Sequence, residues 1–132
     1  MVTRTALATV AVAALTLPVG LVAPAIASHG GGGGDDVRRS GGCSGSAHWK
    51  LKAKSDDGRI EVEGEIDSNR SGQRWSWKIK HNGSVSARGT NKTGGRSGSF
   101  EVERRMANLS GTDHFVFRAE HGRQVCRGTI SF

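Results

Sequence analysis

The sequence predicts an all-β chain that folds as an antiparallel β-sandwich of about seven short strands tied by one disulfide. Three observations predict this class. Beyond residue 43, apolar and polar residues alternate with a period of two, turn signals recur about every 8–12 residues, and no segment has the 3.6-residue period of an amphipathic helix. With 132 residues, 35% hydrophobic residues and 20 glycines, the chain has room for one modest core, so residues 43–132 are expected to form one domain.

Residues 1–27 have the composition of a secretory signal peptide. Met1–Arg4 supplies a positive charge, Thr5–Pro24 is an apolar run, and Ala25-Ile26-Ala27 is a small-x-small cleavage site. Cleavage there would leave a mature chain that begins at Ser28 and keeps 18 of the 19 basic and all 12 acidic residues. The alternative is an uncleaved membrane anchor, which a proline and a glycine within the apolar run disfavour. We therefore expect a secreted, extracellular protein.

Residues 28–42 read SHGGGGGDDVRRSGG and are expected to form a flexible, glycine-rich linker. Cleavage before Ser28 would bring together an amine, an amide nitrogen and the imidazole of His29, which are donors for a weak Cu(II) site. A solvated linker is the favoured interpretation. The sequence therefore predicts neither a metal site nor a cofactor.

Cys43 and Cys126 are the two cysteines of the chain. Both fall on the inward phase of their predicted strands, and cysteine pairs of exported proteins are usually oxidised. We expect one disulfide that ties the first strand to the last, and two free thiols are the alternative. The chain-entropy treatment assigns such a bridge roughly 4–5 kcal/mol.

The segment His48–Asp67 is expected to form a β-hairpin that turns at Asp57-Gly58, because Asp-Gly suits the type I′ turn. In the register set by a two-residue turn, every outer pair joins a lysine to a glutamate and every inner pair is apolar. A slip of one residue would bury the charges. The expected outer pairs are Lys54–Glu61, Lys52–Glu63 and Lys50–Glu65.

The remaining strands follow from the same alternation. Gln73–His81 turns its two tryptophans inward and its basic residues outward. Asn82-Gly83 is a second turn signal, but a two-residue turn there would place Lys80 beside Val85. A bulge, a longer loop or an edge position for the next strand would explain this mismatch. Arg104 falls on the inward phase of its strand, an anomaly that a bulge would also explain. The last four strands are expected at Val85–Gly89, Ser99–Met106, Asp113–Glu120 and Gln124–Phe132, with a polar loop at residues 91–98.

Several motifs resemble those of small secreted actinobacterial proteins of uncharacterised function. They are C-S-G-S before Trp49, D-D-G-R-I-E-V-E-G-E, the tryptophan strand that ends in His81-Asn82-Gly83, S-G-S-F-E-V, and G-T-D before the last two strands. The likeness covers about two-thirds of the chain, residues 43–132, and implies export and an immunoglobulin-like sandwich. In the immunoglobulin D-x-x-x-Y-x-C run, Phe117 replaces the tyrosine and Ala119 the cysteine, so the usual inter-sheet bridge is not expected.

No residue pattern indicates catalysis, and the chain is not expected to be an enzyme. It contains no G-x-S-x-G elbow, no H-E-x-x-H and no phosphate-binding loop. Glu61, Glu63 and Glu65 face lysines, so a structural role is favoured over acid–base chemistry. The five histidines lack metal-ligand spacing and are expected at the surface or in turns. Four N-x-S/T sequons, interpreted as turn chemistry in loops rather than as glycosylation sites, lie at Asn69, Asn82, Asn91 and Asn108.

The least ordinary feature is a segregation of charge. Residues 68–100 hold seven basic residues and no Asp or Glu. Alternation turns Arg74, Lys78 and Lys80 outward on one strand, beside Val85–Gly89. A surface of one sign attracts polyanions, such as teichoic acid, extracellular nucleic acid or acidic glycan. A generic solvated face is the alternative. Because both tryptophans of the Gln73–His81 strand are expected inward, no platform for stacking bases is predicted. The candidate polyanion-binding residues are Arg74, Lys78, Lys80, Arg88 and Lys92.

The sequence therefore favours a secreted, non-enzymatic binding module of the cell envelope or extracellular space, whose partner is an anionic polymer or a secreted protein. The alternative is an extracellular inhibitor of a secreted protease or other hydrolase, which would present loops from a disulfide-tied scaffold. No membrane span is expected after signal cleavage, because no later stretch is long and apolar enough.

Overall fold

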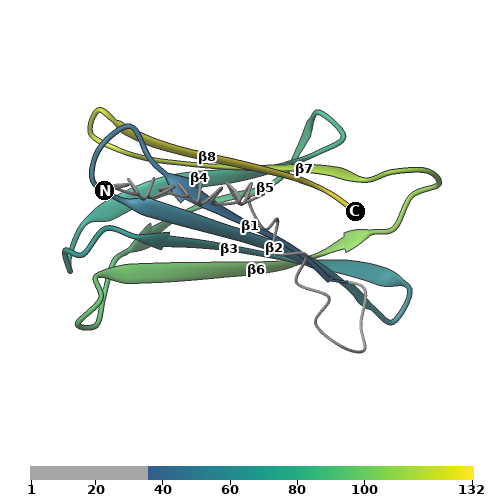
Figure 1. Ribbon diagram of the computed structural model, residues 1–132, viewed down its shortest axis with the longest axis horizontal. Coiled ribbons are helices and arrows are strands. Elements are labelled where there is room, and N and C mark those ends of the chain that lie inside the picture. The colour runs from purple at the N-terminus through teal and green to yellow at the C-terminus, as the bar shows by residue number, and fades with distance from the viewer. Residues whose placement is uncertain (1–35) are drawn as a thin grey trace, which may run out of the picture. The chain divides into compact units, whose positions relative to one another are not determined.

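The computed structural model describes residues 36–132, which form eight β-strands in two four-stranded sheets (Figure 1). The predicted signal peptide and His29 lie outside the described residues. Within residues 36–132, no helix is long and apolar enough to cross a membrane. The strands are β1 (Asp36–Gly42), β2 (His48–Asp56), β3 (Arg59–Asp67), β4 (Arg74–His81), β5 (Ser84–Lys92), β6 (Ser99–Ala107), β7 (His114–His121) and β8 (Gln124–Ser131).

The two sheets pack face to face as an antiparallel β-sandwich, which confirms the predicted fold class (Figure 1). Sheet A has the strand order β1-β2-β3-β6, and sheet B has the order β5-β4-β7-β8. Without β1, this order corresponds to strands A-B-E and C′-C-F-G of an immunoglobulin-like sandwich. The inward side chains of both sheets form one core cluster.

Strand β1 corrects the sequence prediction, which assigned residues 28–42 to a flexible linker and counted about seven strands. Residues 36–42 pair with β2 along their whole length. Val37 packs against the core, and Gly41 leaves room for Trp49, because a Cβ on Gly41 would lie 2.9 Å from atoms of the indole ring. Main-chain pairing and a single apolar side chain hold this strand, and neither produces a recognisable hydrophobic pattern.

The β2–β3 hairpin has the predicted register. Asp57 and Gly58 form its turn with φ values of 47° and 75°, which is the left-handed region that a type I′ turn requires at both positions. The charged side chains therefore stay outside, and Leu51 and Ala53 are buried. The three outer pairs are Lys50–Glu65, Lys52–Glu63 and Lys54–Glu61.

The β4–β5 hairpin combines a tight turn with a bulge. Asn82-Gly83 forms the turn with φ values of 46° and 87°. Lys80 faces Val85, and the register then shifts between Ile79 and Lys80, which is the predicted β-bulge. β5 also lies at the edge of sheet B, as expected, and the longer-loop alternative is wrong. Residues 91–92, expected in a loop, belong to β5.

The second expected bulge, at Arg104, is wrong. β6 pairs with β3 without a register shift, and Arg104 stands opposite Val62. Arg104 keeps its inward phase at the edge of the sandwich, where its guanidinium carbon lies 5.0 Å from the centroid of the Trp77 ring. A cation–π contact at an exposed site contributes about 0.5–1 kcal/mol. The open edge of the sandwich thus accommodates an inward charge without a bulge.

The sheets approach closely where an aromatic ring of one sheet covers a glycine of the other. A Cβ on Gly64 of β3 would lie 2.8 Å from the ring of Phe117, and a Cβ on Gly128 of β8 would lie 2.5 Å from the ring of Trp49. These glycines interrupt the hydrophobic pattern of their strands, yet each provides the space for a large side chain of the facing sheet.

The four sequon asparagines do not all lie in loops. Asn69 and Asn82 have φ values of 57° and 46°, so both adopt the left-handed turn conformation that asparagine tolerates. Asn108 follows β6, as expected of a loop residue. Asn91 is a correction, because it belongs to β5 and its Oδ1 accepts a 2.7 Å hydrogen bond from Nε1 of Trp77.

Cys43 and Cys126 form the predicted disulfide across a sequence separation of 83 residues. Cys126 is buried on β8, whereas Cys43 lies in the loop between β1 and β2 rather than on a strand. Two hydrogen bonds between Ser44 and Val125, of 2.8 and 2.9 Å, hold that loop against the start of β8. The bridge therefore ties sheet A to sheet B, and a disulfide is consistent with an extracellular location.

Removing the disulfide should destabilise the fold, because the unfolded chain would lose a cross-link over 83 residues. We expect Cys43→Ser/Cys126→Ala to lower the free energy of unfolding by about 2–5 kcal/mol in urea titrations. Reduced wild-type protein is the control and should resemble the variant. Equal stability of the oxidised wild type and the variant would contradict a stabilising bridge.

Gly64 tests the close approach of the sheets. Gly64→Ala should lower the free energy of unfolding by about 1–3 kcal/mol, because its Cβ would overlap the ring of Phe117. Gly42→Ala is the matched control, since a Cβ there meets nothing within 4 Å, and it should change stability by less than about 0.5 kcal/mol. Equal urea midpoints for the two variants would show that the close contact at Gly64 does not affect the stability of the fold.

Candidate functional site

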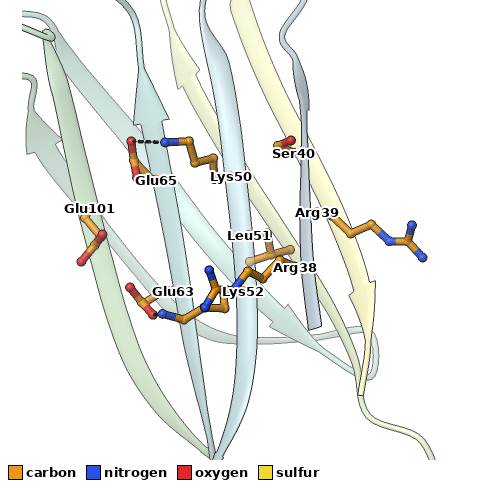
Figure 2. Close-up of a pocket in the computed structure, with 9 residues that line it drawn as sticks. All are labelled: Arg38, Arg39, Ser40, Lys50, Leu51, Lys52, Glu63, Glu65 and Glu101. Atoms are coloured by element: carbon orange, nitrogen blue, oxygen red, sulfur yellow. Dashed lines mark hydrogen bonds and ion pairs between the residues drawn. The ribbon is translucent and has the colours of Figure 1, made fainter. Parts of the chain in front are cut away.

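The charges on the outer face of sheet A largely neutralise one another. Figure 2 shows the Lys50–Glu65 and Lys52–Glu63 ion pairs bridging β2 and β3. The Nζ–Oε1 distance is 3.2 Å for Lys50–Glu65 and 2.7 Å for Lys54–Glu61. Exposed pairs of this kind contribute little stability, so the main effect of this ladder is to fix the register and to leave few free cations on this face.

A groove of about 580 Å³ runs over this ladder between β1 and β6 (Figure 2). Arg38 lines it but pairs with Asp36 at 2.8 Å, and Arg39 points away from the other labelled residues (Figure 2). Glu101 lines its opposite side. The groove therefore presents both signs of charge, and it suits no strongly anionic ligand.

An acidic cluster lies at the β3–β6 side of the groove. Within the described part of the chain, Glu63, Glu101 and Glu103 are the one group of three acidic, histidine or cysteine side chains whose ligand atoms lie within 4.8 Å of one another. Lys52 pairs with Oε2 of Glu63, so an ammonium group already contacts the cluster. Partial burial raises the pKa of Glu101, and the negative charges of Glu63 and Glu65 raise it further.

The outer face of sheet B carries a row of four basic residues, one from each strand, which we call the basic row. Its members are Arg88, Lys78, Arg118 and Arg127, in the order β5, β4, β7 and β8. Neighbouring strands lie about 4.8 Å apart, so the row spans roughly 14 Å at the backbone. These spacings are shorter than the Debye length of about 8 Å at physiological salt, so the four charges act together on an approaching anion.

All five candidate polyanion-binding residues lie on this outer face. Lys78 and Arg88 belong to the basic row, Arg74 faces Lys92 four residues away along the strands, and Lys80 faces Val85. A recess of about 380 Å³ lies on the same face, and we call it the lysine recess. It is lined by three members of the basic row and by Lys80, Gly83 and Val116. Because its charged side chains are all basic, the recess is suited to a phosphate or sulfate group.

Sequence reasoning missed Arg118 and Arg127, which complete the basic row. It followed a run free of acidic residues that ended at residue 100, whereas these arginines come from β7 and β8. The second half of the chain contains a pattern that could have predicted this pair. A turn closed by His121 and Gln124 places Arg118 opposite Arg127.

Glu120 is the one carboxylate on the outer face of sheet B. It lies two residues beyond Arg118 on β7, and its Oε1 accepts a 2.7 Å hydrogen bond from Nε of Arg118. The same oxygen pairs with a terminal nitrogen of that guanidinium. This contact orients Arg118 and partly offsets its charge, so the acidic side chain also marks where a bound polyanion would meet repulsion.

His81 corrects the expectation that all histidines lie at the surface or in turns. At the end of β4 it is 8% exposed, and its Nε2 lies 2.5 Å from Oδ1 of Asp113, which is 1% exposed. The imidazole also stacks on Phe115 with 4.6 Å between ring centroids. This buried pair joins the β4–β5 turn to the segment before β7, so its role in the fold is structural.

Comparisons with protein-family models, with curated proteins and with solved structures find no match to this chain. Its function has therefore to be inferred from its own residues.

Glu101 tests whether repulsion among the neighbouring carboxylates of sheet A lowers the stability of the fold. Because its pKa is raised in the folded state, the ionised carboxylate opposes folding above that pKa, and the cost disappears as pH falls and the group is protonated. Glu101→Gln should therefore raise the Tm at pH 7 by roughly 1–3 °C after solvent screening, and should leave it unchanged near pH 3. Glu65→Gln, which breaks an ion pair, is the control and should not raise the Tm. A Tm increase for Glu101→Gln that persists near pH 3 would contradict the electrostatic origin.

Proposed function

We propose that this chain is a secreted, non-enzymatic binding module that holds an anionic polymer of the cell envelope or extracellular space on the outer face of sheet B. The observation that carries this proposal is the basic row, in which four cations from four strands stand side by side. The predicted signal peptide and the disulfide support the extracellular location.

The contrast between the two outer faces favours a ligand for sheet B. On sheet A each lysine of β2 meets a glutamate across the ladder, whereas on sheet B Lys78 meets Arg88 on one side and Arg118 on the other. Like charges directly opposite each other are unfavourable in a sheet. A bound polyanion would relieve this repulsion and release its own counterions.

The same face offers no aromatic platform. Trp75 and Trp77 are 0% and 4% exposed, and the exposed large hydrophobic residues of the described chain are Val85 and Leu109. Sequence-tolerant binding of single-stranded nucleic acid combines a basic groove with aromatic stacking. Recognition here would therefore rest on backbone charge and hydrogen bonds rather than on bases.

The proposal predicts which cations control binding. Lys78→Ser/Lys80→Ser/Arg127→Ser should elute from heparin resin at much lower salt than wild type. The slope of log affinity against log salt should fall by about 2–3, because each lost phosphate or sulfate contact removes roughly one unit.

Arg39→Ser/Arg70→Ser/Arg96→Ser is the matched control. It removes the same net charge, but none of its three positions lies on the outer face of sheet B. If both triple variants elute together, net charge rather than the basic row governs retention, and the proposed site is wrong.

The inhibitor hypothesis stays a prediction from the sequence. It would gain support if the mature protein recovered a secreted hydrolase from culture medium and lowered the activity of that enzyme.

A further inference from the structure

We infer that the bound polymer is an anionic glycan, whose sugar hydroxyls lie between two groups of cationic side chains on sheet B; this inference rests on the proposed polyanion-binding function. The outer face is not uniformly basic. Next to the basic row stands a line of three hydrogen-bonding residues, which we call the hydroxyl row: Thr90 and Ser76 bear its two hydroxyls, and Glu120 adds a carboxylate. Beyond it, Arg74 and Lys92 form a second basic pair.

The hydroxyl row forms part of a second recess, of about 410 Å³, on the same face. This recess is lined by the three members of the hydroxyl row, by Lys78, Arg88 and Arg118 of the basic row, and by Trp77, Gly89 and Val85. Lys78 and Arg118 also line the lysine recess, so the two recesses share one wall. A ligand that fills both would pass directly over the basic row.

The chemistry of the two recesses differs. The lysine recess offers only cations as charged groups, which suits a sulfate or phosphate. The second recess adds two hydroxyls, which donate and accept hydrogen bonds, and the carboxylate of Glu120, which only accepts them. An acceptor-only group suits the hydroxyls of a sugar and repels an anion. Val85, which is 46% exposed, lines the same recess and offers apolar contact to the C–H face of a sugar ring.

The spacing along β4 supports this order of ligand groups. Arg74, Ser76 and Lys78 follow at two-residue steps, so each step along the outer face is about 6.8 Å. The two cationic groups therefore lie roughly 14 Å apart with the hydroxyl row midway. A polymer that alternates anionic groups with hydroxylated units matches this pattern, in which a hydrogen-bonding row without cations lies between two cationic groups.

A nucleic acid matches the pattern less well. One of its strands carries a phosphate every 3.4 Å or so along a helix axis, and this density would place a phosphate against Glu120. Its bases would also find no exposed aromatic side chain, because both tryptophans of β4 are buried. The glycan is thus the polymer that the observations favour.

The test compares two labelled polymers of equal total charge at the same ionic strength: a hyaluronan oligosaccharide, in which a charged uronate alternates with an uncharged N-acetylhexosamine, and an oligothymidylate. Fluorescence anisotropy gives both affinities for the mature protein. Wild type should bind the glycan more tightly. Ser76→Ala/Thr90→Val should weaken glycan binding by about three- to ten-fold, as expected for one or two neutral hydrogen bonds, and leave oligothymidylate binding unchanged. Ser84→Ala/Ser86→Ala, which removes two exposed hydroxyls of β5 outside the recess, is the control and should bind as wild type does.

Glu120→Gln gives an independent readout. Removing the carboxylate should raise the affinity for oligothymidylate by a few fold and narrow the preference for the glycan, since repulsion of a nearby phosphate is lost. Equal wild-type affinities for the two polymers, or equal weakening of both by Ser76→Ala/Thr90→Val, would overturn the glycan inference alone. Failure of wild type to bind either polymer would overturn the polyanion-binding function itself.

Discussion

The register of the β2–β3 hairpin is the constraint on which the rest of the structure depends. The Asp57-Gly58 turn decides which residues face each other, and a slip of one residue would exchange the core face for the charged face. β1 and β6 add to the two edges of the hairpin, so sheet A inherits its register. Gly64 then falls beneath the ring of Phe117, and this contact seats sheet B against sheet A.

The same alternation has opposite electrostatic consequences in the two sheets. In sheet A, lysines of β2 meet glutamates of β3, and the excess carboxylates collect where β3 meets β6. In sheet B, Lys78 of β4 meets basic residues on both neighbouring strands, and Glu120 is the one acidic side chain on that face. The sandwich thus has one face that is largely self-neutralised and one that is free to attract anions. On the outer face of sheet A most cations have an ionic partner, whereas on that of sheet B most have none.

The sequence was most informative where contacts are local. The register of β2–β3 and the bulge after Asn82-Gly83 follow from turn chemistry and alternation within about 20 residues. Strand β1 was not predicted, because its glycines and arginines give no alternation of apolar and polar residues and its pairing with β2 is made by the main chain. The buried pair of His81 and Asp113 lies 32 residues apart in sequence, and no local pattern brings the two together.

The candidate site could likewise be predicted only where it depends on local contacts. The outward positions of Arg74, Lys78 and Lys80 follow from alternation along one strand. That Arg118 stands beside Lys78, however, depends on β4 pairing with β7 rather than with another strand. Strand order is set by the packing of the whole sandwich, and the basic row therefore becomes visible only in the fold.

An NMR titration of the mature, isotope-labelled protein with a sulfated glycan tests the central claim most directly. It reports which backbone amides sense the ligand without requiring any substitution. We expect salt-sensitive shift changes confined to residues around the basic row, on β4, β5, β7 and β8, with the amides of β2 and β3 unaffected. Shift changes centred on the lysine–glutamate ladder of sheet A, or none at any glycan concentration, would contradict the claim that the outer face of sheet B binds anionic polymers.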